Sequence, residues 1–284
     1  MTIALGVLCT DGAVIGIDLE YTQDFMSSAG QKIFWLPTSL GSQYFILIGA
    51  AGNPDSAKEF VGYLEEQLAE RFPTHVASLK EVKAAIKDSL KYMWFEHVDS
   101  APANERRALG CDFLVAIRVG IDVWLFRTNR TMMVAVKNWA CLGMGLYLAN
   151  YLVDRVLPRY STIELAAQVV AHVIAAAKEH VQFVGKGSDI HMLPRTGLSY
   201  GLSWDEQEKV EAGFTQLFGE FRGIIGCADP AAATDRLLDS RLTSLRSVIE
   251  TLRRDQVERV DVRLKRDQEI EDLIRHRPPI GDPL

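Results

Sequence analysis

Hydrophobic residues open the chain in two short runs, residues 3–9 and 13–18. Both runs are rich in Ile, Leu and Val on both faces of an extended strand, and the intervening Thr10-Asp11-Gly12 step favours a tight hairpin turn. Two further apolar runs, 32–36 and 43–48, are joined by a loop that contains Pro, Gly and Ser. The pattern predicts four strands before the first helix, and the first two should be buried.

Helix-start signals follow the fourth predicted strand. In Asn53-Pro54-Asp55 the asparagine can cap a helix and the proline suits its first position, so we expect a helix that runs to about Arg71. Ser78 and Glu81 form a capping-box signature for a second helix. Periodicity then predicts strands at 111–119, 121–127 and 132–136, helices at 145–156 and 161–181, and short strands at 189–193 and 197–202.

The order of these elements favours an α+β fold. Strands, two helices, strands, two helices and final strands suit two antiparallel sheets packed face to face with helices outside, which is a four-layer αββα sandwich. From Trp204 onward the pattern changes to long amphipathic segments. We therefore expect one domain over 1–203 and a mainly helical extension over 204–284.

The expected extension contains two amphipathic helices, 204–224 and 230–254. Five apolar residues in the second helix keep heptad spacing for two heptads: Leu238, Leu242, Leu245, Ile249 and Leu252. Residues 257–264 fit either an edge strand or a continued helix, because their alternation and their charges disagree. The proline-bearing tail after His276 is expected to be disordered.

Composition narrows the function classes. The chain has 284 residues and a formal net charge of -6, which argues against binding of nucleic acid by charge. It lacks an apolar run of about 18 residues and a secretory signal pattern, so we expect no membrane span and a cytoplasmic location. Its four cysteines are far apart and its six histidines have no zinc-type spacing, so neither a metal nor a cofactor site is expected.

The amino terminus carries the most distinctive chemistry. Thr2 follows Met1, and methionine removal would leave a first residue that has both a free α-amine and a hydroxyl. An α-amine with a pKa of about 7.7 to 8.0 can accept the hydroxyl proton near neutral pH, directly or through water. A nearby carboxylate and lysine would tune that transfer.

Several segments resemble one family. They are the Asp-Gly turn, "AVIGID" at 13–18, "GQKI" at 30–33 and "ILIGAAGNPDSA" at 46–57. Together with Thr2 they resemble the catalytic β-subunit of the proteasome and its simpler bacterial ring-protease relatives, which are amino-terminal-nucleophile (Ntn) hydrolases. The resemblance covers roughly residues 2–200, and this chain would be a divergent bacterial-type member.

The resemblance implies roles for four residues. Thr2 would be the nucleophile, Lys32 the cation that lowers the pKa of its hydroxyl, and Asp18 the carboxylate that orients Lys32. Asp18 lies sixteen positions after Thr2 (18 - 2 = 16), as in the family, whereas Lys32 stands two positions early, which a short deletion would absorb. The backbone N–H of Gly52 would stabilise the oxyanion. The resemblance also implies a peptide or protein substrate and a homo-oligomeric ring, and it leaves an ATPase partner unknown.

Other family positions differ here. Two serines before the third long helix are replaced by Met144 and Leu146, and an aspartate and a serine before Gly185 are replaced by Val181 and Val184. In the family these polar groups help to hold the terminal amine and its water. Two hypotheses therefore stay open: a threonine-type peptidase or amidohydrolase acting through an acyl ester, by hydrolysis or transpeptidation, and a non-catalytic ring subunit or scaffold.

Overall fold

The computed structural model describes residues 2–23, 26–36, 44–72, 78–182, 184–185, 187–228 and 234–275. The chain divides into two compact units, Met1–Glu211 and Ala212–Leu284. Helix α6 (Trp204–Gly226) begins in the first unit and ends in the second. The tail that we expect to be disordered lies outside the described residues.

The first unit contains a five-stranded antiparallel sheet in the order β10-β1-β2-β11-β12. Its strands are β1 (Ile3–Leu8), β2 (Gly12–Asp18), β10 (Trp139–Gly143), β11 (Ser188–Pro194) and β12 (Tyr200–Gly201). The hairpin predicted from the Asp-Gly step joins β1 to β2, and both strands are almost entirely buried. The sequence did not predict β10, which pairs with β1 at the sheet edge.

A second five-stranded antiparallel sheet has the order β5-β6-β7-β8-β9. Its strands are β5 (Ile33–Leu36), β6 (Tyr44–Gly52), β7 (Cys111–Val119), β8 (Asp122–Asn129) and β9 (Met132–Val136). Each was predicted within a few residues. A separate ribbon of β3 (Glu20–Gln23) and β4 (Met26–Ala29) was not predicted, because these short polar strands lack an apolar alternation.

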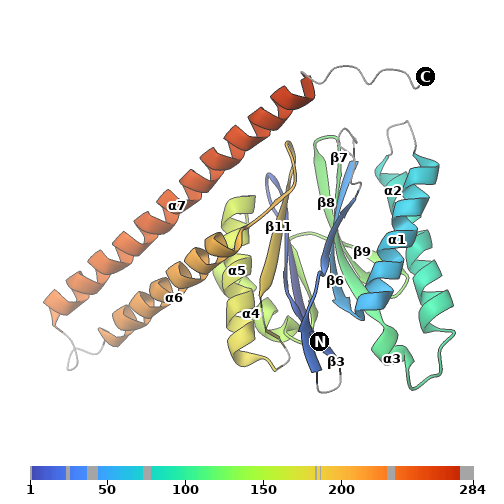
Figure 1. Ribbon diagram of the computed structural model, residues 1–284. Helices are drawn as coiled ribbons and strands as arrows, with labels where there is room; N and C mark the ends of the chain where they lie inside the picture. Colours follow the sequence, from blue (N-terminus) through green and yellow to red (C-terminus); the bar gives the residue numbers. More distant parts are fainter. Residues whose placement is uncertain are drawn as a thin grey trace. The chain divides into compact units, whose positions relative to one another are not determined.

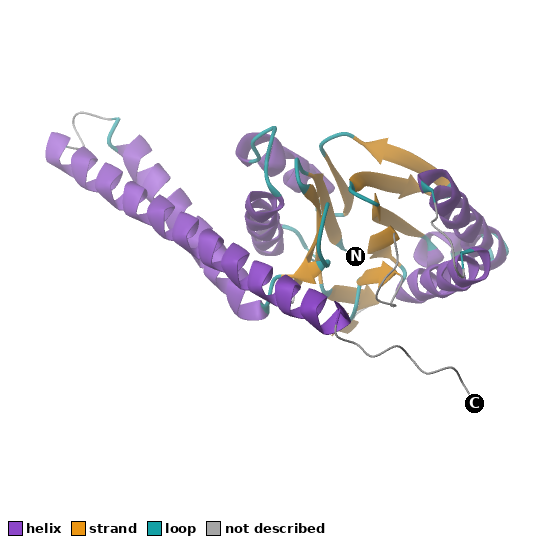
Figure 2. Cartoon of the chain, turned by 90° about the horizontal axis from the view of Figure 1, so that it is seen from above, coloured by secondary structure: helices purple, strands orange, loops and turns teal. Residues whose placement is uncertain are grey.

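Two pairs of helices enclose the sheets. The helices of this unit are α1 (Pro54–Arg71), α2 (Leu79–Tyr92), the π-helical turn η1 (Met93–Val98), α3 (Arg106–Leu109), α4 (Leu146–Val156) and α5 (Ile163–His180). As Figures 1 and 2 show, α1 and α2 cover the second sheet, and α4 and α5 cover the first. The unit is therefore the four-layer αββα sandwich predicted from the order of elements.

Buried side chains fill the spaces between the layers. Between the sheets lie Ile15 and Ile17 of β2, Leu47 of β6 and Leu114 of β7. On the other face of the first sheet, α5 approaches so closely that a Cβ on Gly16 would lie 2.2 Å from Val170 Cγ1. These contacts fix how the strands that carry the candidate site face one another.

The helix starts agree with the capping signals. Asn53 accepts hydrogen bonds from the backbone N–H groups of Asp55 and Ser56 at the start of α1. Ser78 and Glu81 form both bonds of the capping box at the start of α2. Such caps satisfy N–H groups that have no partner within a helix, so they define where each helix begins.

The second unit holds the end of α6 and helix α7 (Asp235–Arg275). Residues 257–264 continue the helix, which settles the alternative left open by the sequence. The predicted heptad stripe is wrong in part, because Leu242 and Ile249 are 46% and 41% exposed whereas Val248 is buried. Among the described residues, no helix is long and apolar enough to cross a membrane.

Candidate functional site

Thr2 is held at the start of β1 by its backbone. Its carbonyl accepts a hydrogen bond of 2.9 Å from the N–H of Met144. Gly143, the residue before Met144, has a φ of 85°. It lies so close to Thr2 that a Cβ on Gly143 would be 1.8 Å from the Thr2 carbonyl oxygen. Only glycine fits this combination of φ and space. The β10 edge strand thus fixes the position of Thr2.

Asp18, at the end of β2, accepts a hydrogen bond from the start of β1 and so connects the two open ends of the hairpin. Its Oδ1 accepts a hydrogen bond of 2.9 Å from the N–H of Ile3, and its Oδ2 accepts longer ones from the N–H groups of Glu20 (3.3 Å) and Gly185 (3.4 Å). The carboxylate is fully buried. Backbone donors from three segments therefore hold it in one orientation.

Lys32 reaches the same point from the other sheet. Its Nζ donates to Thr2 Oγ1 at 2.5 Å, to Asp18 Oδ1 at 3.3 Å, and to the carbonyl of Glu20. The lysine is fully buried, and its own carbonyl accepts a bond of 2.9 Å from the N–H of Ala50 on β6. The structure thus brings together three of the four residues named from the sequence.

Burial sets the electrostatics of this cluster. Desolvation lowers the pKa of Lys32, and the charge of Asp18 opposes that shift. Desolvation likewise raises the pKa of Asp18, against the charge of Lys32 and the Ile3 and Gly185 N–H groups. Removal from water disfavours each charged form, and the opposite charge makes it tolerable. Asp18 compensates the charge of Lys32, and the ammonium contacts the Thr2 hydroxyl.

Gly52 ends β6 at the same end of the sandwich. It lies opposite Cys111 on β7 and has a φ of 142°, and a Cβ there would lie 2.3 Å from the Gly110 carbonyl oxygen. Glycine is therefore required at this position. Gly52 stands two residues beyond Ala50, whose N–H binds Lys32. Within the described part of the chain, no hydrogen bond connects Gly52 to the cluster itself.

The four positions at which the chain departs from the resembled family carry apolar side chains. Val184, next to Gly185, is 4% exposed, Val181 caps the C-terminus of α5, and Leu146 begins α4. Met144 contributes its backbone N–H, whereas the residue is 54% exposed.

The sequence interpretation missed a buried hydroxyl beside Asp18. Ser188, the first residue of β11, is the register partner of Asp18 and is 4% exposed. Because the N–H of Leu19 bonds to the Gly187 carbonyl, the neighbouring pair of Asp18 and Ser188 is the closer, non-hydrogen-bonded type. Among the described residues the Ser188 Oγ has no hydrogen-bond partner. Only the strand register could identify this residue.

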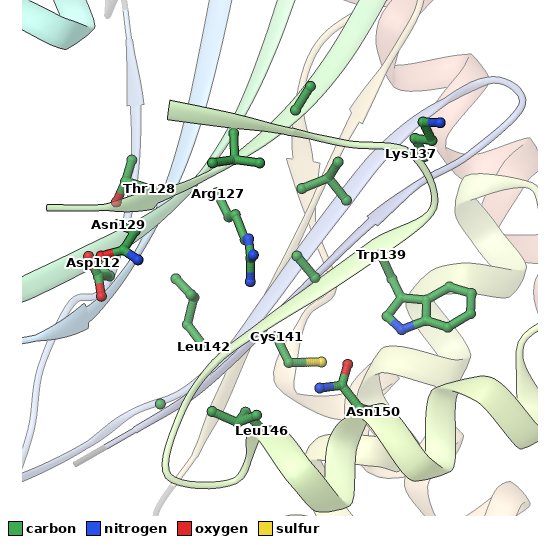
Figure 3. Close-up of a pocket in the computed structure, with 15 residues that line it drawn as sticks. Asp112, Arg127, Thr128, Asn129, Lys137, Trp139, Cys141, Leu142, Leu146 and Asn150 are labelled. Atoms are coloured by element: carbon green, nitrogen blue, oxygen red, sulfur yellow. The ribbon is translucent and has the colours of Figure 1, made fainter. Parts of the chain in front are cut away.

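A cavity of about 500 Å³ opens between the β9 and β10 edges of the two sheets. Thr2, Asp18 and Lys32 do not line it, but it reaches Gly143, which packs against the Thr2 carbonyl. Figure 3 shows the Arg127 guanidinium pointing from β8 into this space, with the Asn150 amide entering from α4. The residues that line it are Asp112, Arg127, Thr128, Asn129, Val134, Ala135, Val136, Lys137, Trp139, Ala140, Cys141, Leu142, Gly143, Leu146 and Asn150. The described residues contain no group of three or more His, Cys, Asp or Glu side chains that could hold a metal ion.

Comparisons with known proteins show similarity in structure. No family model matches the sequence, and no curated protein matches it. Among solved structures, Anbu (ancestral beta-subunit) from Yersinia bercovieri is similar with a TM-score of 0.65 and 15% identity, covering 78% of this chain and 96% of that one. A Gly-1 mutant of Anbu from Hyphomicrobium sp. strain MC1 has a TM-score of 0.63, 13% identity and the same coverage.

A helical assembly of the Anbu complex from Pseudomonas aeruginosa is similar as well, with a TM-score of 0.62 and 15% identity over 77% of this chain and 96% of that one. At these identities the likeness concerns the fold. The chain has the αββα, proteasome-like fold that the order of its elements and the resemblance predicted.

Proposed function

We propose that this chain is a proteasome-like threonine hydrolase that cleaves an amide or peptide bond through Thr2 once Met1 is removed. The observation that carries the proposal is the buried contact of 2.5 Å between Lys32 Nζ and Thr2 Oγ1, with Asp18 behind the lysine. A hydroxyl is a weak nucleophile, and a cation and a proton acceptor beside it are what activation requires. A buried Lys–Asp pair with no such hydroxyl would be a structural ion pair only.

The proposed reaction begins with attack by the Thr2 hydroxyl oxygen on the carbonyl carbon of the substrate. The hydroxyl proton moves to the free α-amine of Thr2, directly or through a water molecule. The tetrahedral intermediate carries its negative charge on the former carbonyl oxygen, where the Gly52 N–H would donate a hydrogen bond. The intermediate then expels the amine, which takes up the proton, and leaves an acyl ester on Thr2.

Water completes the cycle by attacking the ester carbonyl. The Thr2 oxygen recovers a proton through the same amine, and a carboxylic acid leaves. An incoming amine in place of water would give transpeptidation from the same ester. Lys32 keeps its position and its charge next to the developing alkoxide throughout, because Asp18 compensates that charge in a fully buried site.

Removal of Met1 is essential to this proposal. While Met1 is attached, the Thr2 nitrogen belongs to a peptide bond and cannot accept a proton. Thr2 is also only 2% exposed in the chain that carries Met1. The intact mass of the purified protein measures processing directly, and retention of Met1 would place the amine on the wrong residue.

Labelling with a threonine-directed electrophile such as a peptide epoxyketone tests the nucleophile. We expect one adduct per chain, located on Thr2 by peptide mass mapping and absent from Thr2→Ala. Thr2→Ser keeps the hydroxyl and the amine, so it should still be labelled. Thr10→Ala, which removes a threonine at the hairpin turn, serves as the matched control. Labelling that persists in Thr2→Ala would refute the assignment.

A non-catalytic proteasome-like subunit is the second candidate. The apolar groups at Leu146, Val181 and Val184 favour it, since they replace the polar groups that would hold the amine and its water. If this candidate is right, no electrophile should label Thr2 at any pH, whether or not Met1 has been removed. The same mass measurements therefore discriminate between the two functions.

The remaining parts of the proposal concern assembly and surroundings. We propose a homo-oligomeric ring that acts on peptides or proteins in the cytoplasm, without a membrane or nucleic acid partner. Support comes from the fold shared with Anbu, one structure of which is described as a helical assembly. Light scattering at micromolar concentration should give a mass several times that of one chain, and a monomer would contradict this part.

A further inference from the structure

The cavity beside Thr2 is bounded by an unpaired strand edge. The N–H of Leu8 bonds to the Asn138 carbonyl, and the N–H of Met144 bonds to the Thr2 carbonyl. In the segment 138–144, the backbone N–H and C=O groups of the even-numbered residues therefore point toward β1. Because the ladder bonds of an antiparallel strand alternate, the N–H and C=O groups of Trp139, Cys141 and Gly143 point to the outer edge. These three residues line the cavity, and no described strand pairs with that edge.

A cationic side chain stands inside the same cavity. Arg127 is exposed there, and its side chain forms neither a hydrogen bond nor an ion pair with the described residues. Desolvation raises the pKa of Asp112, and the hydrogen bond from the N–H of Arg130 and the charge of Arg127 oppose that shift without reversing it. Lys137 adds a second exposed cation at the rim (Figure 3). Neither the Arg127 nor the Lys137 side chain forms a hydrogen bond or an ion pair with the residues that the structure describes, so both can donate to an anion bound in the cavity.

We propose that this cleft binds the C-terminal end of an extended peptide, which adds as a strand to the β10 edge and places its terminal carboxylate on Arg127. Extended peptides commonly bind by adding a strand to an exposed sheet edge. A guanidinium matches a carboxylate with two parallel hydrogen bonds, and Asn150 supplies a further amide donor. A cavity of about 500 Å³ accommodates a few residues, which favours the end of a peptide over an internal segment.

The position of the cleft relates it to the candidate nucleophile. Gly143 lines the cavity and packs against the Thr2 carbonyl, so a peptide paired with this end of β10 would lie close to the Thr2 backbone. Assignment of this peptide to the part of the substrate that leaves with the new amino terminus rests on the proposed function. Binding itself does not, because it needs only the β10 edge and Arg127.

Binding is measured on the full chain with Thr2→Ala, so that no cleavage can occur. The probe is a fluorescein-labelled Val-Thr-Val-Thr peptide with a free carboxylate, and the same peptide with a terminal amide is the matched ligand. Anisotropy should show at least about tenfold tighter binding of the acid, since a charged hydrogen bond contributes that much. N-methylation of alternate peptide nitrogens should weaken binding of both forms, because it removes the strand pairing.

Variants locate the site. Arg127→Gln should abolish the preference for the acid, Arg127→Lys should retain part of it, and Arg107→Gln, an exposed arginine on α3, should leave it unchanged. Equal affinity for acid and amide would overturn the proposal, as would an acid preference that survives Arg127→Gln in a folded protein. If the protein binds no peptide and Arg127→Gln dissociates its oligomer, the cleft is an interface between copies of the chain, and the peptide proposal is overturned as well. Failure of the hydrolase proposal would appear separately, as unlabelled Thr2 in the wild type.

Discussion

The buried pair of Asp18 and Lys32 predicts a large and pH-dependent loss of stability when one charge is removed. In Asp18→Asn the side chain keeps its shape, and its oxygen can still accept the Ile3 N–H. The change deletes the charge that compensates Lys32 at 3.3 Å, with both side chains fully buried. The change also replaces Oδ2, which accepts from the N–H groups of Glu20 and Gly185, by an NH2 group that cannot accept, so two long hydrogen bonds are lost together with the charge.

The magnitude follows from the distance. Two unit charges at 3.3 Å attract by about 5 kcal/mol at an effective dielectric constant of about 20. Removing one partner of a buried pair typically costs about 3–5 kcal/mol, because the other charge remains without compensation. We expect Asp18→Asn to lower the free energy of unfolding by about that much at pH 7, as measured by denaturant unfolding followed by tryptophan fluorescence.

The loss should shrink as the pH rises. Desolvation lowers the pKa of Lys32 in the folded protein, and without Asp18 nothing in the pair opposes that shift. Between this lowered pKa and about 10.5, the unfolded chain binds a proton that the folded chain does not, so stability increases with pH. Unfolding measured from pH 7 to pH 10 should thus show the variant approaching the wild type.

Two controls make the reasoning refutable. The double variant Asp18→Asn/Lys32→Met removes both charges and should recover most of the lost stability. Glu250→Gln, which breaks the exposed pair with Arg246, should change stability little. If Asp18→Asn unfolds within about 1 kcal/mol of the wild type at pH 7 and shows the same pH slope, the pair does not carry buried charges and the argument fails.

Four further substitutions test the geometry. Gly143→Ala should displace Thr2 and abolish its labelling by an electrophile, whereas Gly120→Ala, also at positive φ but with open space, should cost only about 1 kcal/mol in thermal unfolding and leave labelling intact. Asn53→Ala should destabilise the first unit by about 1 kcal/mol, seen as a lower Tm, because two N–H groups lose their cap. Gly62 lies in an exposed part of α1 with no neighbour within 4 Å of an added Cβ. Gly62→Ala should therefore increase the free energy of unfolding by about 1 kcal/mol and raise the Tm, and a lowered Tm would contradict this.

The first strands of the fold were predictable because their signals are local. The Asp-Gly turn sets the β1–β2 register, which places Asp18 opposite Ile3 at the hairpin end. Caps at Asn53 and Ser78 likewise act within one helical turn and mark where α1 and α2 begin. Such features depend on residues a few positions apart.

Elements whose stability comes from distant partners were missed. The strand β10 is a short run of apolar and small residues without polar alternation, and it forms because β1 offers an open edge for its backbone. The stripe on α7 was misassigned because the side of a helix that is buried depends on its neighbour: a Cβ on Gly213 of α6 would lie 2.6 Å from Leu252. A heptad pattern alone does not specify which side that is.

By itself the sequence determined most of the strand and helix order, the Asp-Gly turn, the helix caps at Asn53 and Ser78, and the three residues named for the chemistry. Only the tertiary structure decided that Lys32, from the second sheet, contacts Thr2 and Asp18 from the first in a buried environment that shifts the pKa of both charged groups. It also decided that Ser188 stands beside Asp18 and that a cleft with Arg127 opens next to Thr2. The physical reason is range: turns and caps depend on neighbours in sequence, whereas desolvation, charge pairing and open strand edges depend on atoms that only long-range strand pairing brings together.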